Sequence, residues 1–357
     1  MKNNEQNDRV RGSLIGGAIG DALEFPVEFI DSYEEIQMRY GENGITRLDT
    51  GHRWTKTIMD KAVISDDTQM TLFTALGLLN AKEKGMAPVP AICHAYIEWL
   101  YTQKGMRSKR YNDCWIGDLP ELNVCRAPGY TCITALEKII EGREPMNDSK
   151  GCGGIMRIAP IPLYGLSQNR IQDVAVLDEL AADAAKLTHE HELGYIPAYV
   201  MSHIIYRLAN DESPTNESFR SYVVEAMQQV SQKFEYIEYS IGILQALLEK
   251  AFDLAYANIP DYEAIQQIGG GWVAEETLAI AVYCCAKHFD DFEKAMIASV
   301  NHGGDSDSTG AVTGNILGAA IGYEAIPEHF KTDLQLHDVI LHVADDLWRG
   351  YTTRFIK

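Results

Sequence analysis

Acidic and hydroxyl side chains crowd into two short stretches of this 357-residue chain. One stretch is Ser65-Asp66-Asp67-Thr68, and the other, far downstream, is Asp305-Ser306-Asp307-Ser308, preceded by a Gly-Gly pair. Neighbouring carboxylates repel one another and are costly to bury unless a cation is bound between them. Both stretches offer only oxygen donors, which select hard cations such as Mg²⁺, Mn²⁺ or Ca²⁺ rather than zinc.

The two acidic stretches would form one metal site if the fold brought them together. Their oxygen donors suit two ions roughly 3.5–4 Å apart; these donors are Ser65, Asp66, Asp67, Asp305, Asp307 and Ser308. The alternative is that each stretch only caps a helix, with its charges favoured by the helix dipole. The sequence leaves both interpretations open, although the presence of two such stretches favours the metal site.

Two predicted helices carry stripes of glycine that could bring these stretches together. Residues 9–24 place glycine at every fourth position, and residues 311–322 do the same directly after the second acidic stretch. Glycine costs about 1 kcal/mol per position within a helix, so a stripe of it indicates close packing against another backbone. The glycines are Gly12, Gly16 and Gly20 in one helix, and Gly314, Gly318 and Gly322 in the other, with Gly310 one position before it at the same spacing. We expect the two helices to cross at close range.

Further candidates lie in loops. The glycine-rich segment 151–157, which follows Ser149-Lys150, could hold a phosphate with its backbone N–H groups, or be an ordinary turn. His189 is expected to form hydrogen bonds in a pocket rather than to bind a metal. Trp272, after three glycines, could stack on a base or merely anchor its loop. Glu28 follows a turn at Pro26 and is either a third carboxylate of the site or a solvated side chain.

Helical periodicity predominates along the rest of the chain. The predicted helices cover 68–81, 89–101, 133–141, 174–187, 196–209, 218–233, 237–257, 275–289, 291–299 and 334–349. Only 44–48 could form a strand, and it would be short. No repeat or linker divides the chain, so we predict a single all-α domain over residues 1–357.

Composition limits the partners and the compartment. The net charge is −20, which argues against general binding to nucleic acid or to an anionic membrane. Residues 1–11 contain no apolar core of a signal peptide, and the apolar run 278–286 is shorter than the roughly 20 residues that span a bilayer. Seven cysteines without a CxxC pair suit reduced thiols. We therefore expect a cytoplasmic protein.

Taken in order, five motifs resemble those of the ADP-ribosylglycohydrolase family. They are Gly-Asp-Ala-Leu-x-x-Pro-x-Glu (20–28), Ser-Asp-Asp-Thr-Gln-Met (65–70), Gly-Cys-Gly-Gly-Ile-Met-Arg (151–157), Leu-Thr-His (187–189) and Gly-Gly-Asp-Ser-Asp-Ser-Thr-Gly (303–310). The resemblance extends over about residues 9–325. Three positions depart from the family pattern: Glu24 replaces a usual glycine, and Ser65 and Ser308 stand where threonine is frequent but retain the hydroxyl.

The resemblance implies an all-α fold with a cleft for ADP-ribose and a centre of two Mg²⁺ or Mn²⁺ ions. The implied metal ligands are Ser65, Asp66, Asp67, Asp305, Asp307 and Ser308. The implied substrate-binding residues are Ser149, Lys150, Gly151, Cys152 and Gly153 around the pyrophosphate, His189, and Trp272 at the adenine. Glu28 or Asp307 would be the catalytic acid or base, and the residues do not decide between them.

The implied activity is Mg²⁺-dependent removal of ADP-ribose from modified protein side chains, with arginine-linked ADP-ribose favoured over serine-linked. The partner would be the modified protein, which could be a regulated enzyme or the target of an ADP-ribosylating toxin. One alternative is hydrolysis of a small metabolite that contains ADP-ribose. Another is a non-catalytic binding or structural member of the same fold. The complete acidic set favours an enzyme.

Overall fold

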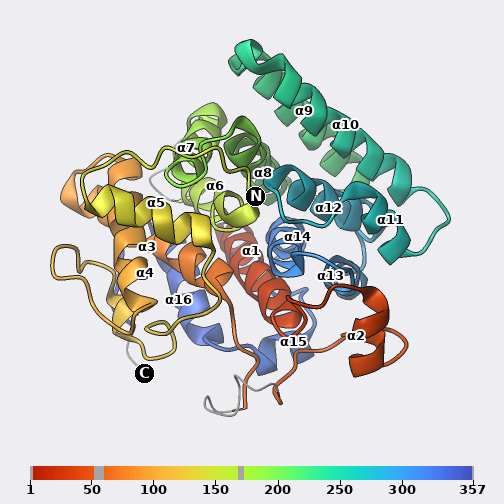
Figure 1. Cartoon of the computed structure of the whole chain (residues 1–357), viewed down its shortest axis with the longest axis horizontal. Coiled ribbons are helices and arrows are strands. Elements are labelled where there is room, and N and C mark those ends of the chain that lie inside the picture. Colours follow the sequence, from red (N-terminus) through yellow and green to blue (C-terminus); the bar gives the residue numbers. More distant parts are fainter. Residues whose placement is uncertain (1–2, 52–59, 168–172, 356–357) are drawn as a thin grey trace.

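The computed structural model describes residues 3–51, 60–167 and 173–355 and shows an almost entirely helical chain (Figure 1). The α-helices are α1 (Asn3–Glu24), α2 (Tyr33–Tyr40), α3 (Asp66–Lys84), α4 (Pro88–Thr102), α5 (Tyr130–Ile140), α6 (Pro160–Gly165), α7 (Val174–Lys186), α8 (Glu192–Asn210), α9 (Asn216–Lys233), α10 (Glu238–Ala255), α11 (Asp261–Ile268), α12 (Ala274–Lys287), α13 (Phe292–Val300), α14 (Ser306–Ile321), α15 (Glu328–Asp333) and α16 (His337–Arg349). The short 3₁₀ helices are η2 (Trp115–Asp118), η3 (Cys152–Gly154) and η4 (Glu235–Ile237). The all-α prediction is confirmed.

Strand-like pairing is confined, within the described residues, to the isolated bridges Ala62–Leu334 and Gly151–Val273. The segment 44–48, considered as a short strand, is irregular. In the part of the chain that the structure describes, no helix is long and apolar enough to cross a membrane.

The two glycine-striped helices, α1 and α14, lie side by side at the centre of the molecule (Figure 1). A Cβ atom would lie 2.4 Å from the Gly318 carbonyl oxygen if placed on Gly12, 2.3 Å from that of Gly314 if placed on Gly16, and 2.0 Å from that of Gly310 if placed on Gly20. The order of these pairs shows that the helices are antiparallel. No side chain larger than hydrogen fits at these positions, so the predicted close crossing is confirmed.

A reciprocal pair of hydrogen bonds fixes the register of α1 against α14. The Ser13 hydroxyl donates to the Asn315 carbonyl oxygen at 2.8 Å, and the Asn315 side-chain amide donates to the Ser13 carbonyl oxygen at 2.8 Å. Both side chains are buried, so neither bond competes with water. This register places the carboxyl end of α1 beside the amino end of α14.

The helix that follows the first acidic stretch, α3, is buried along most of its length. The Ser65 side chain caps it by accepting a hydrogen bond from the Asp67 N–H at 3.1 Å, and Gly85 ends it in the left-handed conformation. Because α3 packs against both α1 and α14, its amino end also points to the meeting point of those two helices.

Most of the long helices begin and end within four residues of the predicted bounds, but α1 begins at Asn3 rather than at residue 9, and α14 begins at Ser306 rather than at residue 311. Four short α-helices were not predicted. These are α2, α6, α11 and α15, with 8, 6, 8 and 6 residues. A helix of eight residues or fewer shows too little of the 3.6-residue period to be recognised, and its formation depends on tertiary packing.

Candidate functional site

Both acidic stretches line one cleft of about 510 Å³, which lies where α1 ends and α3 and α14 begin. The cleft is also lined by the glycine-rich loop around η3 and by the loop before α12. The predicted site residues that line it are Glu28, Asp66, Asp67, Gly151, Cys152, Gly153, His189, Trp272, Asp305 and Ser308. Positions far apart in the sequence are therefore brought to a single concave surface.

One hydrogen bond joins the two acidic stretches directly. The Ser308 hydroxyl, in the first turn of α14, donates to Asp67 Oδ2 at 3.0 Å, and both side chains are buried. Ser65 does cap α3, so that part of the alternative interpretation holds. The carboxylates beside it do more than cap: Asp67 reaches α14, and Asp66 Oδ2 accepts from the Gly129 N–H at 3.3 Å.

The second stretch is clamped by the two loops. The Cys152 thiol donates to Asp305 Oδ2 at 2.7 Å, and the Asp305 N–H donates to the Gly270 carbonyl oxygen at 2.8 Å. The loops also contact each other, because the Cys152 N–H donates to the Trp272 carbonyl oxygen at 3.3 Å. The Trp272 ring remains 52% exposed at the cleft, so its face is accessible to a ligand.

Asp21 is the residue that the sequence analysis missed. Its carboxylate is completely buried and accepts hydrogen bonds from the Ser65 N–H at 2.8 Å, the Thr68 N–H at 3.0 Å and the Thr68 hydroxyl. It therefore ties the end of α1 to the beginning of α3. A carboxylate one residue after a glycine stripe was the available signal, because such a residue must lie near whatever the striped helix contacts.

Glu28 reaches the cleft through a tight turn after α1. The Phe25 N–H donates to the Asp21 carbonyl oxygen at 2.9 Å, and the Ile30 N–H donates to that of Val27 at 2.9 Å, so residues 25–30 form successive turns directly after α1. The Glu28 side chain is 8% exposed and lines the cleft, which does not fit a solvated glutamate. Glu24, which departs from the family pattern, is completely buried.

The His189 imidazole is a neutral group on the cleft wall. It is 2% exposed, and Nδ1 lies 2.8 Å from the Thr188 hydroxyl oxygen. Burial, and to a lesser extent the nearby Arg157 guanidinium, lower the pKa of His189 to about 3. The ring is thus uncharged at neutral pH and can form hydrogen bonds with a ligand.

The remaining predicted residues are placed differently. Ser65 is fully buried at the helix cap, and the Asp307 side chain lies outside the described residues. Neither Ser149 nor Lys150 lines the cleft. The Lys150 ammonium forms an ion pair with the buried Glu275 carboxylate, so its charge is already partly neutralised.

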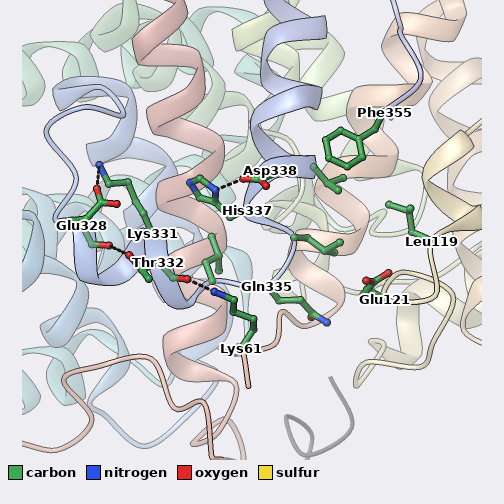
Figure 2. Close-up of a pocket in the computed structure, with 13 residues that line it drawn as sticks. Lys61, Leu119, Glu121, Glu328, Lys331, Thr332, Gln335, His337, Asp338 and Phe355 are labelled. Atoms are coloured by element: carbon green, nitrogen blue, oxygen red, sulfur yellow. Dashed lines mark hydrogen bonds and ion pairs between the residues drawn. The ribbon is translucent and has the colours of Figure 1, made fainter. Parts of the chain in front are cut away.

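Figure 2 shows a second cavity, of about 450 Å³, between α15, α16 and the segment around Lys61. Several of its polar groups are bonded to protein partners: the Lys331 ammonium pairs with Glu328 at 3.1 Å, His337 Nδ1 lies 2.9 Å from Asp338 Oδ1, and the Lys61 ammonium donates to the Thr332 carbonyl oxygen. Of the carboxylates of the two acidic stretches whose side chains the structure describes, none lines this cavity. The predicted carboxylate and hydroxyl side chains come together in the cleft at α3 and α14 instead.

Comparison with known proteins identifies the family of this chain. The sequence model of the ADP-ribosylglycohydrolase family matches residues 2–355. The chain belongs to this family. The ADP-ribosyl-(dinitrogen reductase) glycohydrolase of Rhodospirillum rubrum is 26% identical over 347 residues, which cover 96% of each chain. The ADP-ribosylhydrolase ARH3 of Homo sapiens is 26% identical over 220 residues, covering 57% of this chain and 59% of its own.

A solved structure, described as an ADP-ribosylglycohydrolase-related protein complex, has a similar fold. It matches with a TM-score of 0.69 and 24% identity, covering 98% of this chain and 100% of that chain. This ADP-ribosylglycohydrolase is therefore an all-α member of the family and a hydrolase of the glycosidic bond to ADP-ribose.

The donor set in this ADP-ribosylglycohydrolase fits a hard cation by its chemistry. Asp66, Asp67, Asp305 and Ser308 present carboxylate and hydroxyl oxygens to one cleft, as Mg²⁺ and Mn²⁺ prefer. Among the described side chains, no three His, Cys, Asp or Glu residues form a compact cluster suited to a metal ion. The carboxylates are instead bonded to the Ser308 hydroxyl and the Cys152 thiol, which a cation would have to replace.

Proposed function

We propose that this ADP-ribosylglycohydrolase removes ADP-ribose from modified protein side chains in a Mg²⁺-dependent reaction. The observation that carries the proposal is the Ser308–Asp67 hydrogen bond at 3.0 Å, because it places both acidic stretches at one cleft. The cleft, of about 510 Å³, is within the usual size range for small-molecule sites. The relatives named above act, by their names, on ADP-ribosylated dinitrogen reductase or as an ADP-ribosylhydrolase.

Asp66, Asp67, Asp305 and Ser308, with Ser65 and Asp307, would hold two Mg²⁺ ions, and Mn²⁺ would suit the same oxygens. When bound, the ions would supply Lewis acidity and a template for the ribose hydroxyls. Glu28 is the best-placed acid or base of the described residues, because its carboxyl group is held at the cleft and could take a proton from water. Asp307 remains the alternative for that role.

The two ends of ADP-ribose would be held by different loops. At the pyrophosphate, the backbone of Gly151–Gly153 has no side chain to block close approach except Cys152. At the adenine, the half-exposed Trp272 ring offers a stacking face. Because Lys150 is paired with Glu275, backbone N–H groups would provide most of the contacts to the phosphates.

The residues at the mouth of the cleft favour an arginine linkage. Phe29 and Tyr130 line the cleft and are 70% and 83% exposed, and the acidic Glu28 adjoins Phe29. A guanidinium leaving group is a flat cation, which binds to aromatic faces and to carboxylates. A serine linkage offers only a neutral oxygen and would gain neither contact.

The proposal is tested by release of ADP-ribose from ADP-ribosyl-arginine and ADP-ribosyl-serine peptides, and from O-acetyl-ADP-ribose, in Mg²⁺ or in EDTA. Release of ADP-ribose is expected in Mg²⁺ but not in EDTA, and it should be fastest from the arginine peptide. Asp67→Asn and Asp305→Asn should each reduce kcat/KM by about 100-fold or more. Asp290→Asn, at an exposed carboxylate between α12 and α13, is the matched control.

Three results would contradict the proposal. Release that persists in EDTA or in Asp305→Asn would refute the metal-dependent mechanism. Exclusive hydrolysis of O-acetyl-ADP-ribose would identify a small metabolite as the substrate. Binding of ADP-ribose without hydrolysis of any substrate would contradict catalysis on these linkages.

A further inference from the structure

Behind the glycine-rich loop lies a buried arginine that the chemistry above does not use. Arg157 is completely buried, and its hydrogen-bond partners among the described residues are all neutral. They are the Thr188 hydroxyl at 2.7 Å, the Ala184 carbonyl oxygen at 3.3 Å, and the sulfur atoms of Met70 and Cys132, each at 3.4 Å. The guanidinium also lies 4.3 Å from the centre of the Tyr96 ring. The guanidinium carries a positive charge and offers only hydrogen-bond donors.

Thr188 connects this arginine to His189. A guanidinium can only donate hydrogen bonds, so the Thr188 oxygen accepts from Arg157 Nη2. The same oxygen lies 2.8 Å from His189 Nδ1. Thr188 is completely buried, so its own hydrogen also needs an acceptor within the protein. The alternatives are His189 Nδ1 and the sulfur of Cys132.

The sulfur is the poorer choice. Thiol sulfur is a weak acceptor, and the Cys132 sulfur already faces Arg157 Nη1 at 3.4 Å. The Thr188 hydroxyl therefore donates to His189 Nδ1. Because only one of the two nitrogens of a neutral imidazole carries a hydrogen, that hydrogen must then be on Nε2.

His189 Nε2 faces the open backbone of the glycine-rich loop. A Cβ atom on either Gly151 or Gly153 would lie 3.3 Å from Nε2, so side chains at these positions would crowd this atom. Among the described residues, no hydrogen bond involves Nε2, although the ring is 2% exposed and lines the cleft. A buried donor that faces the cleft and has no partner among the described residues is available to an acceptor in the ligand.

We propose that Arg157 and Thr188 are positioning residues that hold His189 as the neutral Nε2–H tautomer, so that Nε2 always presents a donor to a phosphate oxygen of the ligand on the glycine-rich loop. The assignment of that ligand to ADP-ribose rests on the proposed function. With the hydrogen on Nδ1 instead, Nε2 would direct a lone pair at an anion and repel it. The glycines at 151 and 153 leave the donor accessible.

The tautomer can be measured on the free protein by long-range ¹H–¹⁵N NMR of ¹⁵N-histidine-labelled chain at pH 7. The His189 signals are assigned by their loss in His189→Gln. Nε2 is expected to be protonated and Nδ1 unprotonated, both in the wild type and in Thr188→Ser, which keeps the hydroxyl. Thr188→Val is expected to give a mixture of tautomers. A wild-type ring protonated on Nδ1, or on both nitrogens, would overturn the proposal.

Calorimetric titration with ADP-ribose tests the role of the donor. Thr188→Val should weaken binding about tenfold, as expected for the loss of one hydrogen bond to a charged group, and Thr188→Ser should remain within about twofold of the wild type. Equal affinity of Thr188→Val and the wild type, with both folded by circular dichroism, would refute the proposed donor. If the wild type failed to bind ADP-ribose, the proposed function would fail, whereas the tautomer measurement would stand or fall separately.

Discussion

Carboxylates in this protein have two different tasks within a few residues of each other. Asp21 accepts three hydrogen bonds from the beginning of α3 and is completely buried, so its task is to position that helix. Asp67 and Asp305 each accept a bond from a neutral hydroxyl or thiol at the cleft wall, which a cation could replace. Asp21 therefore positions the beginning of α3, which carries Asp67 at the cleft.

The change Asp21→Ala should strongly destabilise the protein. It would leave the buried N–H groups of Ser65 and Thr68 without their acceptor, at a cost of about 1–3 kcal/mol for each. We expect the free energy of unfolding, measured with urea, to fall by about 3 kcal/mol. Asp21→Asn keeps one acceptor oxygen and should lose about half as much. An effect no larger than that of Asp290→Ala, on the surface, would contradict this role for Asp21.

The sequence could predict which residues line the site, but not which polar residues position helices or pair with one another. Asp66, Asp67, Asp305 and Ser308 could be identified because acidic and hydroxyl residues gather in two short stretches, and Glu28 because residues 20–28 resemble a family motif; all of them line the cleft. The role of Asp21 was missed because it depends on a contact with α3, which is 44 positions away in the sequence. For the same reason, the ion pair between Lys150 and Glu275 could not be foreseen.

At the scale of elements, the α1–α14 crossing sets the geometry of the site. Glycine weakens an isolated helix, so the cost of the stripes must be recovered by contact between the two backbones. The crossing could be predicted because a four-residue glycine spacing appears in two places. The short helices α2, α6, α11 and α15 could not be, since packing rather than periodicity stabilises them.

Replacing a glycine of the α1–α14 crossing by alanine should lower the free energy of unfolding, whereas the same replacement at an exposed glycine of another helix should raise it. A Cβ on Gly16 would lie 2.3 Å from the Gly314 carbonyl oxygen, which forces the helices apart. Gly16→Ala should therefore lower the free energy of unfolding by about 3 kcal/mol or more, as overpacking does in cores. A Cβ on Gly242, within α10, would have no other atom within 4 Å, so Gly242→Ala should stabilise the protein by about 0.5–1 kcal/mol.

Urea unfolding of Gly16→Ala, Gly242→Ala and the wild type measures both changes in the free energy of unfolding. A Gly16→Ala protein as stable as the wild type would show that the helices separate at little cost. The site should respond as well, because α1 and α14 deliver Asp21 and Ser308 to α3.

At the scale of the whole molecule, charge is the unusual property. The net charge is −20, yet the proposed substrate is a diphosphate. Several of the carboxylates line the cleft itself, and the nearby Lys150 is paired with Glu275. Attraction of the substrate therefore has to be local. It would come from cations bound by the acidic residues, from backbone N–H groups of the loop, and from the buried charge of Arg157.

The buried His189 imidazole should make the free energy of unfolding decrease as the pH falls. In the folded protein, burial holds the pKa of His189 at about 3, whereas an unfolded chain has the ordinary value of about 6.5. Between these values the unfolded state binds a proton that the folded state does not, so the free energy of unfolding decreases as the pH falls. The contribution of this histidine should reach about 1.4 kcal/mol per pH unit below pH 6.

Carboxyl groups with raised pKa values, such as buried Asp178 and Glu98, change stability in the opposite direction, so variants are needed to isolate the histidine. Urea unfolding at pH 7, 6 and 5 should give a shallower dependence for His189→Gln than for the wild type. His329→Gln, at an exposed position on α15, controls for the removal of a histidine. Equal slopes for His189→Gln and the wild type would mean that His189 accepts a proton in the folded state. In that case the ring could not remain a neutral donor as the pH falls, and ADP-ribose binding should change over the same pH range.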